Sequence, residues 1–133
     1  MIALDTNVLL RFLLRDDEEQ AEAAERLMLQ LTLDEPGFVS REVLVELVWA
    51  LEYTFRFGRE QIATILNQLL HVAAVEIECA SDVVEAAGGY RLGGADFADR
   101  MIAAAARRAG ALPLYTFDRK AARLPGVTLL EAR

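Results

Sequence analysis

The chain has 133 residues, and 21 acidic against 14 basic side chains give it a formal net charge of −7 at pH 7. Its hydrophobic fraction of 54% predicts a single folded domain over residues 1–133 and excludes an intrinsically disordered chain. The single cysteine, Cys79, excludes an internal disulfide and a multi-cysteine metal site. The acidic balance disfavours non-specific binding to nucleic acid, although carboxylates that hold divalent cations would reverse the local charge.

The first residues lack the basic and apolar segments of a signal peptide. No apolar run reaches the roughly 18 residues that a membrane helix needs. We therefore expect a cytoplasmic protein that does not contact a membrane.

Short apolar runs alternate with amphipathic segments along the whole chain. This alternation predicts an α/β fold in which helices cover both faces of a parallel sheet. Strands are expected at residues 2–4, 38–40, 75–77, 112–115 and 127–130. Helices are expected at residues 8–14, 16–31, 41–55, 59–70 and 81–87, where Gly88 and Gly89 follow, and from Asp96 onward.

Asp5 comes directly after the first predicted strand. In an open parallel sheet, ligands bind beyond the carboxyl ends of the strands, so Asp5 is a candidate binding residue. Either Asp5 or Thr6 can instead serve as the N-cap of the following helix.

Glu46 lies in the middle of the predicted helix 41–55, which is apolar almost all round. A buried carboxylate needs a partner, so Glu46 is expected to meet either a base such as Arg41 or a metal ion. Glu42, one turn earlier, is a weaker candidate for the same role.

The stretch 93–106 begins with two glycines and continues as an alanine-rich helix. Asp96 and Asp99 lie three residues apart at its start and project from nearly the same face. They can cap the helix and interact favourably with its dipole. Alternatively they face other acids, since so apolar a helix is expected to be buried.

Asp118 follows the fourth predicted strand. Right-handed crossovers would bring Asp118 and Asp5 to one edge of the sheet, with Glu46 and Asp99 arriving from flanking helices. Four close carboxylates repel one another unless divalent cations neutralise them. Oxygen-only ligands favour Mg²⁺ or Mn²⁺ over zinc.

Four segments, in this order along the chain, resemble the motifs of PIN-domain ribonucleases and, more narrowly, of VapC-type toxins of type II toxin–antitoxin systems. They are residues 2–7, the helical Glu46, residues 98–105 and residues 116–120. The resemblance implies a three-layer α/β/α sandwich with a central, mostly parallel sheet. It also implies Mg²⁺- or Mn²⁺-dependent endonucleolytic cleavage of RNA, in which one ion activates water and another stabilises the departing oxygen.

The resemblance also assigns residues. Four acids match the catalytic, metal-binding set of the family: Asp5, Glu46, Asp99 and Asp118. Four further positions match supporting residues: Thr6, Asn7, Asp96 and Thr116. Among these, Asp96 resembles an accessory carboxylate that acts through water, and Asp118 matches the more variable of the four acids.

Partners follow from the same resemblance. It implies an RNA substrate, a cognate antitoxin protein and a homodimer, or a larger toxin–antitoxin assembly. We expect the antitoxin to insert a basic side chain, an Arg in particular, near Asp5 and Asp99. An apolar surface that includes Trp49, Tyr53, Phe55 or Phe57 would hold its amphipathic helix.

Two other functions compete with this interpretation. The chain could be a non-catalytic PIN-like binding scaffold, but crowded carboxylates without a function would only lower its stability. It could be a Mg²⁺-dependent phosphatase or phosphotransfer domain with Asp5 as the nucleophile. Haloacid-dehalogenase-like phosphatases place a second Asp two residues later, however, and here that position is Asn7.

Overall fold

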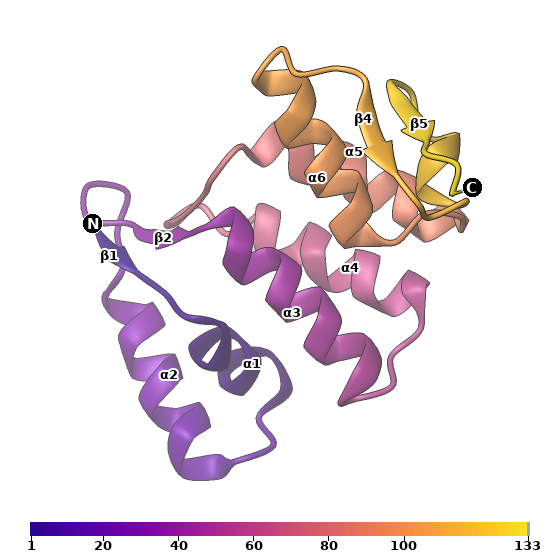
Figure 1. The fold of residues 1–133 in the computed structure, drawn as a ribbon. Coiled ribbons are helices and arrows are strands. Elements are labelled where there is room, and N and C mark those ends of the chain that lie inside the picture. Colours follow the sequence, from indigo (N-terminus) through magenta and orange to yellow (C-terminus); the bar gives the residue numbers. More distant parts are fainter. Residues whose placement is uncertain (133) are drawn as a thin grey trace.

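The computed structural model describes residues 1–132 and has a mixed α/β architecture (Figure 1). Its elements follow in the order β1 (Ile2–Ala3), α1 (Thr6–Leu14), α2 (Glu18–Gln30), β2 (Gly37–Val39), α3 (Arg41–Tyr53), α4 (Arg59–Leu70), β3 (Val75–Ile77), α5 (Ala80–Leu92), α6 (Phe97–Arg108), β4 (Leu114–Thr116), the 3₁₀ helix η1 (Ala121–Arg123) and β5 (Val127–Leu129). Most of these lie within two residues of their predicted places, and α4 and β3 have the predicted bounds.

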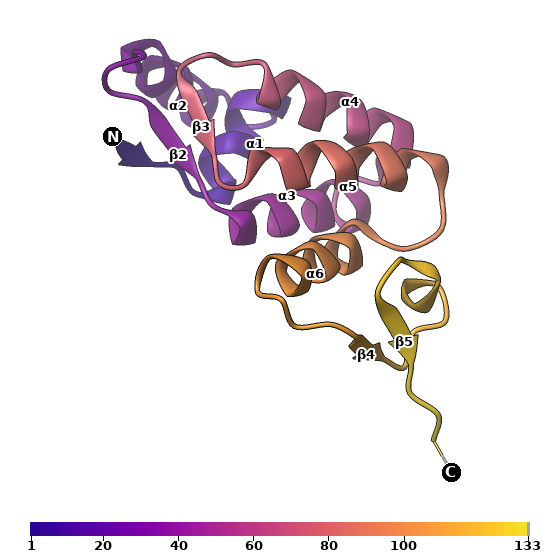
Figure 2. The same cartoon turned by 90° about the horizontal axis from the view of Figure 1, so that it is seen from above.

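The strands pair in parallel, which confirms the predicted fold class, but they are divided between two sheets. One sheet has the order β1-β2-β3, and the other pairs β4 with β5. The two sheets lie well apart in both ribbon views (Figures 1 and 2). The strand after α6 therefore does not extend the first sheet.

The backbone hydrogen bonds show which strands are paired in each sheet. Directly after β1, the Leu4 amide donates to the Phe38 carbonyl of β2 at 2.8 Å. In the other sheet, the Leu130 amide donates to the Thr116 carbonyl at 2.7 Å. Within residues 1–132, β1 and β4 are thus paired on one side only, β1 with β2 and β4 with β5. The expectation that their carboxyl ends share one sheet edge is wrong for this structure, because β4 takes β5 as its neighbour.

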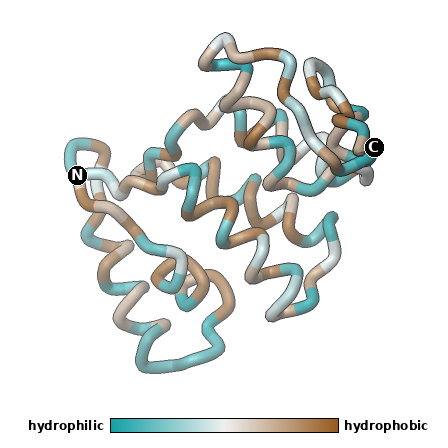
Figure 3. The backbone as a smooth tube through the Cα atoms, in the orientation of Figure 1, coloured by the Kyte–Doolittle hydropathy of each residue, from teal (hydrophilic) through white to brown (hydrophobic). Residues whose placement is uncertain are grey.

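The core lies among α1, α3, α4, α5, α6 and the first sheet. On α3, Leu44, Leu47 and Leu51 are fully buried, whereas Trp49 is exposed. Burying each leucine contributes roughly 1.5–3 kcal/mol. Hydrophobic and hydrophilic stretches alternate along the other helices as well (Figure 3). Although α3 reads as apolar almost all round, it has one face toward solvent.

The prediction that the helix after β3 ends at Ala87, before the glycine pair, is wrong. Helix α5 continues through Gly88 and Gly89 to Leu92. Glycine inside a helix costs about 1 kcal/mol relative to alanine. At Gly89 a Cβ atom would overlap the guanidinium of Arg100, so the missing side chain gives this arginine its space.

No helix within residues 1–132 has both the length and the apolar character needed to cross a membrane.

Candidate functional site

A groove of about 730 Å³ opens beside α1, α3 and α6. Three of the eight catalytic and supporting residues predicted from the sequence line it: Thr6, Asn7 and Glu46. The rest of the lining is mainly apolar and includes Trp49, Met101 and Ile102, with Arg41 and Glu42 at its polar part. The groove therefore combines an apolar wall with a few polar groups, the usual composition of a binding site.

Asp5 stands at the entrance to α1 as its N-cap. Its Oδ1 accepts a hydrogen bond from the Thr6 amide at 2.8 Å, and the side chain is exposed. The capping role considered from the sequence is thus real, and it keeps the carboxylate at the carboxyl end of β1. Thr6 is 3% exposed, and its buried Oγ1 has no hydrogen-bond partner within the described residues.

Glu46 is exposed on the groove wall and forms no ion pair among the residues described. The expected pairing with Arg41 is absent because that arginine turns the other way. Its Nη1 lies 2.7 Å from Asp82 Oδ2, and its Nη2 donates to the Met101 carbonyl at 2.7 Å. Glu46 is therefore a free carboxylate facing the groove.

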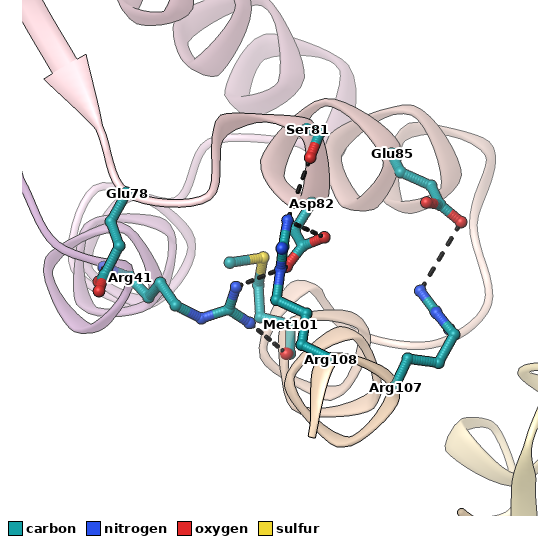
Figure 4. A network of polar contacts seen from close by, with 8 residues as sticks. All are labelled: Arg41, Glu78, Ser81, Asp82, Glu85, Met101, Arg107 and Arg108. Carbon is teal, nitrogen blue, oxygen red and sulfur yellow. Dashed lines mark hydrogen bonds and ion pairs between the residues drawn. The ribbon is translucent and has the colours of Figure 1, made fainter. Parts of the chain in front are cut away.

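The Arg41 contacts form a network that joins three helices (Figure 4). The backbone amide of Arg41 donates to Glu78 Oε1 at 2.9 Å. Asp82 Oδ1 also accepts a hydrogen bond from Arg108 Nη2 of α6. The hydrogen bonds from Arg108 and Arg41 hold the pKa of Asp82 below its usual value, against the opposing effect of burial. This network fixes the start of α3, which carries Glu46, against α5 and α6.

Asp99 lies half-buried in the first turn of α6. Its pKa is raised above the ordinary value, first by burial and then by the negative charges of Asp118 and Asp96, while a backbone hydrogen bond from Asp96 opposes the shift. Asp118 and Asp96 are thus close enough to disfavour the negative charge of Asp99, and a cation beside these acids would offset that effect.

Asp118 is held at the start of the 3₁₀ helix that follows β4. Its Oδ1 accepts the Ala121 amide at 2.8 Å, and its own amide donates to Thr116 Oγ1 at 3.0 Å. Thr116 therefore orients the backbone that carries Asp118. Asp96 is the N-cap residue of α6, but its side chain makes no capping bond and pairs with Arg59 at 3.2 Å instead.

The structure does not gather the four acids predicted to converge. Glu46 lines the groove and Asp5 is the N-cap of α1, whereas Asp99 is influenced by Asp118 and Asp96. Across residues 1–132, the structure holds no cluster of three or more Asp, Glu, His or Cys side chains that could share an ion. The expected four-carboxylate cluster is not formed, because β4 lies outside the sheet of β1.

The donor chemistry nevertheless suits Mg²⁺ or Mn²⁺. The candidate ligands are carboxylates, the groups these hard cations prefer. The raised pKa of Asp99 also marks a place where added positive charge is favourable. A shared ion would require these acids to approach one another.

The sequence interpretation missed Arg59 and Arg100, whose guanidinium groups surround the loop before α6. Arg59 is 37 positions from Asp96, so no local spacing could have pointed to this pair.

Comparison with known proteins adds the following. The PIN domain matches residues 2–127 of the chain. A VapC ribonuclease of Aquifex aeolicus (strain VF5) is 31% identical over 121 residues, which cover 90% of this chain and 89% of that protein. No solved structure matches the chain.

Proposed function

Because this chain belongs to the PIN-domain family, we propose that it is a metal-dependent endoribonuclease acting as the toxin of a toxin–antitoxin pair. The observation that carries the proposal is Asp99, held half-buried at the start of α6 in the field of two other acids. A protein keeps such repulsion mainly where a bound cation or a basic partner offsets it.

We assign the following four residues to the cation: Asp5, Glu46, Asp99 and Asp118. When bound, the ion would lower the pKa of a water molecule and stabilise the departing oxygen of the phosphodiester. The chain itself supplies orientation. The Asp5 carboxylate is held by the Thr6 amide, and Asp118 is held through Thr116 and Ala121.

Incubating the protein with a mixed RNA pool tests this function. We expect cleavage with Mn²⁺ or Mg²⁺ and none with EDTA. Glu46→Gln should lower the rate at least about 100-fold, because it removes a charge that faces the groove. Glu42→Gln, on the same helix and groove, should retain most of the activity and so controls for a general loss of negative charge. If wild-type protein leaves RNA intact in both metals, the chain is a binding scaffold instead.

We further propose that the antitoxin lays an amphipathic helix over the groove. Trp49 is 59% exposed and Tyr53 54% exposed on α3, and their ring centroids lie 5.5 Å apart. Phe55 and Phe57, considered for the same surface, instead pack partly buried against the core. An Arg of the partner would find the free Glu46 carboxylate beside this aromatic pair.

Trp49→Ala is expected to weaken inhibition by the product of the adjacent gene by 10-fold or more, since exposed aromatic anchors dominate such interfaces. Leu29→Ala is the matched control, because Leu29 is 77% exposed on α2 and does not line the groove. Inhibition constants from RNA cleavage measure the effect. Equal losses in the two variants, or none in either, would place the partner elsewhere.

A further inference from the structure

The loop that precedes α6 is held by two arginine side chains. Arg59 Nη2 donates to the Gly94 carbonyl at 2.9 Å, and Arg100 Nη2 donates to the Gly93 carbonyl at 2.9 Å. The Ala95 carbonyl accepts from Arg100 Nε at 3.1 Å and from Arg59 Nη1 at 3.3 Å. All three carbonyls of the loop therefore end on a guanidinium group.

Arg59 reaches further than this loop. Its Nη1 also donates to the Tyr90 carbonyl at the end of α5, at 3.0 Å, and its Nη2 lies 3.2 Å from Asp96 Oδ1. One side chain at the start of α4 thus contacts both the last turn of α5 and the N-cap of α6. Only the planar, forked guanidinium can make all of these bonds at once.

Arg59 packs against a buried aromatic side chain. Its guanidinium carbon is 4.5 Å from the ring centroid of Tyr90, within the range of a cation–π interaction. The Tyr90 side chain is fully buried, its hydroxyl donates to Glu52 of α3, and its ring packs edge-on against Phe97 at 6.1 Å. Movement of Arg59 would disturb a packed contact among α3, α5 and α6.

We propose that Arg59 is a positioning residue that sets the place of the first turn of α6 and therefore of the Asp99 carboxylate. Asp99 comes three residues after the N-cap Asp96, so a shift of the anchored loop moves it directly. This inference rests on the proposed function, in which Asp99 binds the metal ion. It assigns Asp96 to the anchor, as the partner of Arg59, and not to the metal.

Arg59→Gln tests the inference, with Arg107→Gln as the matched control. Arg107, in the last turn of α6, makes an ion pair with Glu85 at 3.8 Å. We expect Arg59→Gln to weaken Mn²⁺ binding roughly 10-fold, in the range found for residues that orient metal ligands. We expect Arg107→Gln to leave it unchanged. Mn²⁺ affinity is read from the rise of the melting temperature with Mn²⁺ concentration, which needs no activity.

Arg59→Lys is the second variant, and it keeps the charge but loses the fork. It should resemble Arg59→Gln if geometry matters, and wild type if charge alone matters, which would overturn the proposal. If Arg59→Gln fails to fold, Arg59→Lys alone tests the inference. Hydrogen exchange of residues 93–100 in EDTA should accelerate at least about 10-fold in both Arg59 variants and not in Arg107→Gln.

Asp96→Asn separates the two possible roles of Asp96. If Asp96 acts through Arg59, combining Asp96→Asn with Arg59→Gln should weaken Mn²⁺ binding no more than the stronger single change does. Additive losses would show that Asp96 contacts the metal independently and would overturn the assignment. Wild-type protein that binds no Mn²⁺ refutes the proposed function. Normal binding by both Arg59 variants refutes only this inference.

Discussion

Asp99→Asn is expected to abolish RNA cleavage while raising the melting temperature of the protein in EDTA. The substitution removes a half-buried charge that burial, Asp118 and Asp96 all disfavour, and it hardly changes the volume. Relief of this repulsion is worth about 1 kcal/mol after solvent screening, or roughly 3–5 °C for a chain of this size. Circular-dichroism melting curves of the two proteins measure the difference.

Saturating Mn²⁺ should reverse the order of the two melting temperatures. A ligand that binds only the folded state stabilises it in proportion to its concentration and affinity, and the variant loses that affinity. If the metal does not change the difference between the two proteins, Asp99 is a structural residue at the helix start. Loss of a helix cap cannot imitate the reversal, because the N-cap of α6 is Asp96.

The stability of the wild-type protein in EDTA, relative to Asp99→Asn, should fall as the pH rises. The pKa of Asp99 is raised in the folded state, so the folded protein binds more protons than the unfolded chain in the interval between the two pKa values. Wild-type stability therefore falls relative to Asp99→Asn as the pH rises through that interval. The advantage of the variant should be full above the raised pKa of folded Asp99 and should vanish well below the ordinary aspartate pKa of about 3.9, where the carboxyl is neutral in both states.

Phe97→Ala should have the largest effect on stability. Phe97 is 1% exposed and packs against Tyr90, the buried residue that supports Arg59. Truncating such a ring costs about 3–5 kcal/mol, a large part of the 5–15 kcal/mol that typically separates folded from unfolded protein. The midpoint of urea unfolding should fall sharply.

Phe117→Ala provides the control for this measurement. The same chemical change occurs at a side chain that is 68% exposed after β4. We expect its free energy of unfolding to stay within about 0.5 kcal/mol of wild type. A comparable loss in both variants would mean that the segment after β4 contributes far more to the folded core than its exposure indicates.

The sequence by itself predicted the elements whose causes are local. Asp5 caps α1, and α4 begins and ends where its apolar periodicity does. Such features depend on residues three or four positions apart, which interact whatever the rest of the chain does. The order of the sequence motifs also predicted the PIN family, and the match over residues 2–127 confirms that family.

Only the tertiary structure decided which partners distant residues take. Arg41 pairs with Asp82 and leaves Glu46 free, Arg59 reaches Asp96, and β4 pairs with β5 instead of joining the sheet of β1. A guanidinium or an open strand edge can satisfy its hydrogen bonds with several partners of similar energy. The choice among them depends on how the helices pack around the core, and no spacing within the sequence records it.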